Sequence, residues 1–170
     1  KWWSRELSVG SLAVLPVVSL STNQEIGYLA DALTEGLIGE LGRIDGLSVI
    51  SRTSSNRYRT TDLMVPDIAS ELGVDALIEG SVQAFEDALK IELRLVDGRS
   101  DRQVWSGSYE SGWGGVRKLQ GRIAREVAER IRINLSPDTE AELSRHKEMS
   151  PDAFRFWVLG NHYLLGNDDA

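Results

Sequence analysis

A nearly continuous apolar run at residues 11–19 constrains the fold most, because a strand without a polar face must be covered on both sides. Thr22 and Glu25 follow with the spacing of a capping box, and apolar residues then recur with a helical period up to residue 44. After a turn at residues 45–46, the short apolar segment 47–50 predicts a second strand. A helical crossover joins parallel strands, so we expect a βαβ opening.

The second half of the chain predicts antiparallel strands. Residues 75–85 favour a strand, and the next segment alternates apolar and polar residues, with Leu89, Ile91, Leu93 and Leu95 on one face. A third strand at residues 103–110 follows a turn rich in Gly, Ser and Asp. The three strands predict an antiparallel meander. With the βαβ opening, they predict an α/β fold with a mixed, α+β-type sheet.

Further helices are expected around and after these strands. Pro66 and Gly73 bound a short helix, and apolar spacing predicts a long helix over residues 116–135. Ser-Pro pairs at residues 136–137 and 150–151 begin two more helices, which we interpret as an appendage. Residues 52–62 are polar and without periodicity, which predicts an exposed loop.

Composition and motifs argue against several function classes. The formal net charge of -7 disfavours nucleic acid as a partner, since phosphate backbones attract clustered Lys and Arg. The chain has no cysteine, and its two histidines, His146 and His162, lack metal-ligand spacing and are interpreted as surface residues. No catalytic motif is found in the sequence, so we expect no enzyme activity, no metal site and no cofactor. The alternative is an enzyme with an unrecognised site of Asp, Glu, Arg and Ser residues.

A series of segments, in order, resembles the TolB N-terminal-like family. They are AVLP at 13–16, DALTE at 31–35, GLSVISRTSS at 46–55, ELGV at 71–74, EGSV at 79–82, LVD at 95–97, Trp105, Tyr109 and LQ at 119–120. The resemblance covers residues 11–135 and implies a module of bacterial signalling proteins. Such modules often stand between an anchored output domain, such as a winged-helix regulator or nucleotide cyclase, and tetratricopeptide repeats. Ala32 and the glycine-rich segment 111–115 depart from the family pattern.

Three segments are expected from these patterns. Residues 1–10 are a juxtamembrane or linker segment, because Lys1, Trp2, Trp3 and Arg5 suit a membrane interface; an ordinary solvated start is the alternative. Residues 11–135 form the α/β domain. Residues 136–170 begin a helical array, since Phe156, Leu159, Gly160 and Tyr163 have the spacing of a tetratricopeptide helix. An ordinary amphipathic helix packing back on the domain is the alternative.

The segment after the second strand is the candidate binding site, because ligands collect at the carboxyl ends of parallel strands. Its candidate residues are Arg52, Ser54, Ser55, Arg57, Tyr58 and Arg59. Arginines with hydroxyls suit a carboxylate, a phosphate or an acidic peptide. The alternative is that Arg52 pairs with an acid of the first helix, Asp31 or Glu35.

These features predict a non-catalytic sensory or scaffold module whose partner is a protein or peptide. A small anionic ligand and a homodimer are left open. The expected location is the periplasmic face of the bacterial inner membrane, with membrane contact only through an anchor before Lys1. The alternative is a cytoplasmic scaffold next to a cyclase or winged-helix regulator.

Overall fold

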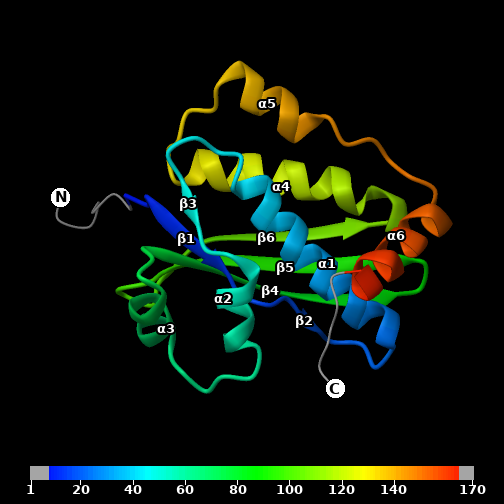
Figure 1. Ribbon diagram of the computed structural model, residues 1–170, viewed down its shortest axis with the longest axis horizontal. Helices are drawn as coiled ribbons and strands as arrows, with labels where there is room; N and C mark the ends of the chain where they lie inside the picture. Colours follow the sequence, from blue (N-terminus) through cyan, green and yellow to red (C-terminus); the bar gives the residue numbers. More distant parts are fainter. Residues whose placement is uncertain (1–7, 165–170) are drawn as a thin grey trace.

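A mixed sheet of six strands organises the computed structural model, which describes residues 8–164 (Figure 1). The strands lie in the order β3–β1–β4–β5–β6, and β2 pairs with β4 beyond the end of β1. β1 runs parallel to β3 and β4, whereas β4, β5 and β6 form an antiparallel meander. The predicted α/β fold with a mixed sheet is confirmed. The strands are β1 (Ser11–Val14), β2 (Val18–Ser19), β3 (Ser48–Val49), β4 (Ala76–Phe85), β5 (Ala88–Asp97) and β6 (Gln103–Ser111).

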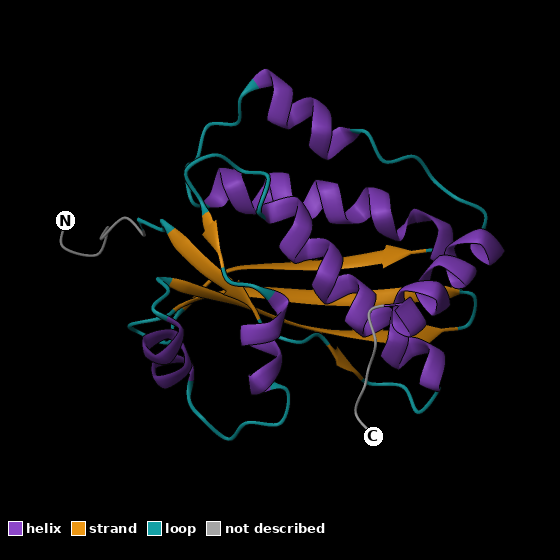
Figure 2. Cartoon of the chain, viewed as in Figure 1, coloured by secondary structure: helices purple, strands orange, loops and turns teal. Residues whose placement is uncertain are grey.

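Helices lie on both faces of the sheet (Figure 2). They are α1 (Gln24–Leu41), α2 (Arg52–Ser55), α3 (Val65–Leu72), α4 (Val116–Arg130), α5 (Pro137–Ser144) and α6 (Pro151–Leu164), with short 3-10 turns η1 (Asn56–Tyr58) and η2 (Trp113–Gly115). Side chains alternate across β1, so Leu12 and Val14 join the core under α1 and α4. Ala13 points the other way, into a smaller core closed by η1 and α3.

The apolar run at residues 11–19 forms two short strands, where the sequence predicted one. Leu15 N–H still bonds to the Ile78 carbonyl of β4, at 2.9 Å, but Pro16 has no N–H to offer. The Val17 N–H turns away to the Thr34 hydroxyl, at 3.0 Å. Pairing with β4 resumes at β2, and the break turns the following residues toward the other face of the sheet.

Local boundaries differ from expectation at three places. The side chain of Asn23, and not that of Thr22, caps α1 by accepting the Glu25 N–H at 2.9 Å. The expected exposed loop at residues 52–62 is wrong in its first half, where α2 and η1 form after a Ser51 cap. The long helix begins at residue 116 as predicted but ends at Arg130, because Arg132 takes a left-handed conformation with φ 61°.

The two helices after residue 135 form as predicted and pack on α1 and α4. Leu143 of α5 and Phe154 and Val158 of α6 are buried in the same core as the sheet. The expectation of surface histidines is wrong for His146, whose Nε2 lies 2.6 Å from Oε1 of the buried Glu40. His162 stacks on Tyr28 of α1, with ring centroids 3.8 Å apart. α6 therefore packs on α1 and contributes to the core of the domain.

Membrane contact was expected only at the start of the chain. Lys1, Trp2, Trp3 and Arg5 lie outside the described residues. Within residues 8–164, no helix is both long enough and apolar enough to cross a membrane.

Candidate binding site

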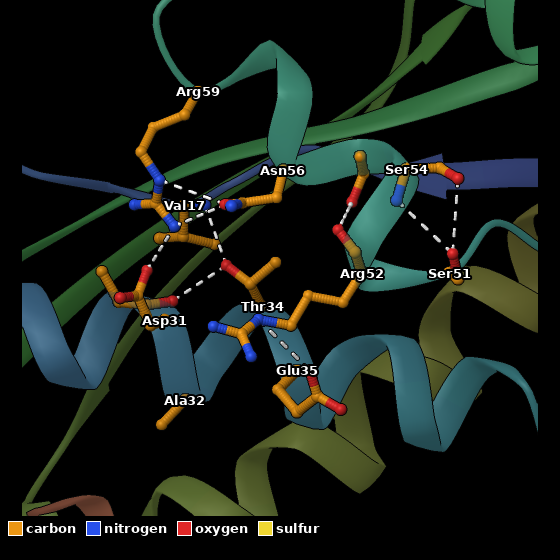
Figure 3. A network of polar contacts seen from close by, with 12 residues as sticks. Val17, Asp31, Ala32, Thr34, Glu35, Ser51, Arg52, Ser54, Asn56 and Arg59 are labelled. Carbon is orange, nitrogen blue, oxygen red and sulfur yellow. Dashed lines mark hydrogen bonds and ion pairs between the residues drawn. The ribbon is translucent and has the colours of Figure 1, made fainter. Parts of the chain in front are cut away.

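The predicted site residues lie on α2, on η1 and, for Arg59, directly after η1. Figure 3 shows three of them, Arg52, Ser54 and Arg59, with Arg52 and Arg59 next to α1. Arg52 Nε lies 3.5 Å from Glu35 Oε2, which confirms the pairing of Arg52 with an acid of the first helix. Arg59 donates to Asp31 Oδ1 at 2.7 Å and to the side chain of Asn56 at 2.8 Å. Two of the predicted arginines are therefore neutralised by α1 and fasten α2 and η1 to it.

Burial separates the remaining candidates. Ser55 is fully buried, and Tyr58 is 9% exposed, with its hydroxyl donating to Glu71 at 2.7 Å. This hydrogen bond, more than burial, raises the pKa of the Tyr58 phenol. Ser54 is half-buried, and its N–H bonds to Ser51 Oγ at 3.4 Å. Since helical turns point residues three or four apart to the same side, Ser55 and Tyr58 both face inward and do not form the exposed surface expected of a loop.

Thr34 links this region to the break between β1 and β2. Its hydroxyl accepts from Val17 N–H at 3.0 Å and donates to the Ala30 carbonyl at 2.9 Å, and both bonds are buried. A buried N–H needs a partner, so the Thr34 hydroxyl replaces the strand partner that Val17 lacks. This contact holds β2 in place and leaves Val18 53% exposed.

The helix-free part of the sheet beside η1 is hollowed into a groove of about 740 Å³, which we call the open-face groove. Its apolar rim comes from β2 and from the segment before α3, and its floor is small and polar. The rim includes Val18, Leu20 and Leu63, and the floor includes Ser81, Ser106 and Ser108. Tyr58 and Arg59 also line it, so one end of the predicted site borders the groove.

Charges in the open-face groove are largely paired within the sheet. Arg94 of β5 contacts Glu79 of β4 at 3.3 Å, and Lys90 contacts Glu92 at 2.9 Å. The alternation of β5 predicted this wet face. The apolar rim was not predicted. The apolar run at residues 11–19, which contains Val18, is typical of a strand buried on both faces, so Val18 was not expected on an open surface.

Chemistry-bearing clusters are sparse in the described residues. Between residues 8 and 164, no group of three or more His, Cys, Asp or Glu side chains is arranged to hold a metal ion. A small cavity of about 20 Å³ lies between α1, α2 and α6 and is lined by Glu35, Arg52 and His162 among others. Its volume suits a water molecule rather than a substrate.

The sequence of the chain was compared with protein families and with curated proteins. No protein-family model matches the chain. A Rhizobium meliloti (strain 1021) protein named "Putative adenylate cyclase 3" is 30% identical over 155 residues, which is 91% of this chain. The chain spans only 26% of the length of that relative.

Solved structures share the fold at low sequence identity. TolB from Acinetobacter baumannii has a TM-score of 0.55 and 11% identity, over 74% of this chain and 29% of that chain. Lipoprotein GNA1162 from Neisseria meningitidis has a TM-score of 0.50 and 18% identity, over 71% of this chain and 99% of that chain. The chain therefore has a TolB-like fold, as its sequence segments implied.

Proposed function

We propose that the chain is a non-catalytic protein-binding module of a bacterial membrane-anchored signalling protein. The open-face groove is the observation that carries this proposal. Its apolar rim and hydroxyl-lined floor suit an extended or helical segment of another protein, because apolar area supplies affinity and the scattered polar groups supply orientation. The charged side chains at its floor already form ion pairs with each other, so a bound protein segment does not have to supply a partner for a buried charge.

The predicted binding residues take two roles in this proposal. Arg57 is exposed and available to acidic groups of the partner, whereas Arg59 borders the groove while paired with Asp31. Arg52, Ser54, Ser55 and Tyr58 hold α2 and η1 in place through their contacts with neighbouring elements. A protein partner with acidic residues next to an apolar anchor fits this surface.

The signalling role rests on the longer relative. A module that matches about a quarter of a protein named as an adenylate cyclase is placed to pass a binding event to an output segment elsewhere in the parent chain. We place the module on the periplasmic face of the inner membrane, with the anchor before Lys1. Residues 136–170 begin the helical array, and the exposed Phe156 and Tyr163 of α6 offer an apolar face to a following helix. Reporter fusions upstream of Lys1 and after Ala170 test the topology, and two cytoplasmic signals would contradict it.

Site-specific photo-crosslinking tests the binding role. A photoreactive phenylalanine analogue replaces Leu63 on the rim, or the exposed Lys147 as a matched control, in the full-length gene product in its own bacterium. We expect a discrete cross-linked species from position 63 and none from position 147. The species should disappear when Leu20→Asp is added, since this exposed substitution puts a charge on the rim without touching the core. Equal labelling at both positions, or a species unaffected by Leu20→Asp, would overturn the proposal.

An ATP assay separates a binding module from a cyclase domain. The purified 170-residue chain is incubated with ATP and either Mg²⁺ or Mn²⁺, and the product is measured against protein concentration. We expect no cyclic nucleotide above the buffer control. Formation in proportion to the protein would show that this segment is catalytic.

A further inference from the structure

The outer edge of β6 is exposed in the described part of the chain. β6 stands last in the sheet, with β5 on its inner side. Ser106, Ser108 and Glu110 are exposed along it. An open strand edge presents unpaired N–H and C=O groups, and these groups can pair with a strand of another chain.

The hydrogen-bonding alternation identifies the outward groups of β6. The Asp97 N–H donates to the Arg102 carbonyl at 2.9 Å, so these two residues form a bonded pair. The register shift between Leu95 and Val96 adds one residue to the β6 side. Bonding to β5 then falls on the odd-numbered residues Trp105, Gly107 and Tyr109. The N–H and C=O groups that point outward belong to Ser106, Ser108 and Glu110.

We propose that this edge binds a second copy of the chain, with β6 antiparallel to β6 and Gly107 on the two-fold axis. β6 spans Gln103–Ser111, so residue 107 is its midpoint, and this register pairs residues 105–109 while the Val104 carbonyl keeps its bond from Arg130. Ser106 then lies opposite Ser108 of the second copy as a hydrogen-bonded pair. The outward groups that no neighbour in the sheet satisfies are thereby paired, and the two sheets become one.

Side chains along the edge complement each other in this register. On the helix-covered face, Trp105 lies opposite Tyr109 of the second copy, and aromatic cross-strand pairs are favourable. At the ends, Glu110 lies opposite Val104, whose carbonyl accepts from Arg130 Nε at 2.8 Å. No like charges face one another in this register.

The sequence of β6 also lacks the features that keep strand edges apart. Natural edges use Lys, Pro or central bulges against unwanted pairing. Gln103–Ser111 contains no Lys, Arg or Pro, and its register shift lies at one end, next to Val104. These properties leave the edge open to a strand partner, and the opposition of Trp105 and Tyr109 across the two-fold register favours a second copy of the chain as that partner.

Sedimentation velocity of the 170-residue chain tests the proposal. We expect a concentration-dependent dimer for the wild type and for Ser108→Ala, which keeps the backbone N–H. Ser108→Pro removes an N–H that points away from β5, so it should give a monomer with unchanged circular dichroism. A wild type that stays monomeric at every concentration would overturn the proposal. A folded Ser108→Pro variant that still dimerises would do so too.

Cysteine cross-linking tests the register and needs no proline. The chain has no cysteine of its own, so introduced thiols are the only ones. Ser106→Cys and Ser108→Cys are prepared separately and then mixed under mild oxidation. A bonded antiparallel pair has a Cα separation of about 5.5 Å, which suits a disulfide. We expect the mixture to cross-link faster than either variant alone, and equal rates in all three samples would overturn this register.

Discussion

The Thr34 hydroxyl joins α1 to the break between β1 and β2, since it accepts from Val17 N–H and donates to the Ala30 carbonyl of its own helix. Thr34→Val keeps the shape but leaves the buried Val17 N–H without a partner, which should destabilise the fold by about 1–3 kcal/mol. Thr34→Ser retains the hydroxyl and is the matched control. Denaturant unfolding measures the loss, and amide hydrogen exchange locates it. The Val17 amide should exchange faster in Thr34→Val but not in Thr34→Ser; equal protection in both would contradict this role.

The ion pairs near α2 could be predicted from the sequence only where the charges of the residues determine the partner. Arg52 has its partner among the two acids that the sequence offered, Asp31 and Glu35. Arg59 was expected to be free for a ligand, yet it takes the other acid. The sequence pattern could not predict this, because the pairing depends on η1 turning Arg59 back toward α1. Surface ion pairs of this kind contribute less than about 1 kcal/mol each, so their main effect is positional.

Elements with strong periodicity were predicted well, and short elements were not. The alternation in β5 and the apolar stripe of α1 extend over many residues, so local pattern and tertiary packing agree there. α2 has four residues and depends on the Ser51 cap and on contacts with α1. β2 exists because Pro16 interrupts pairing and Thr34 accepts the next N–H. Both elements depend on partners distant in sequence, and the open-face groove is lined by β2 and by Tyr58 of η1, which follows α2.

Close packing of α4 against α5 is a prediction at the same scale. A Cβ on Gly121 of α4 would overlap the Leu143 carbonyl oxygen of α5. Gly121→Ala should therefore destabilise the protein by about 1–3 kcal/mol. A Cβ added to Gly39 of α1 would meet only open space, so Gly39→Ala is the control. This substitution should raise the stability of the protein by up to about 1 kcal/mol, because Ala favours a helix more than Gly does. Thermal unfolding of the two variants in parallel checks the sign, and a neutral Gly121→Ala would show that α5 can move away freely.

At the scale of the whole molecule, α6 packs on α1 and joins the core of the sheet although it follows the sheet in sequence. Phe154 is fully buried and contacts Trp113 and Trp157, whereas Phe156 on the same helix is 74% exposed. Phe154→Ala should cost about 3–5 kcal/mol and lower the unfolding midpoint of the entire domain. Phe156→Ala removes the same side chain from the surface and should change stability by less than about 0.5 kcal/mol.

Denaturant unfolding followed by tryptophan fluorescence and by circular dichroism measures both variants. If Phe154→Ala loosened only α6 and left the midpoint of the sheet unchanged, the helices after residue 135 would be a separate unit. A single, lowered midpoint by both probes would instead show that α6 unfolds together with the sheet and its groove.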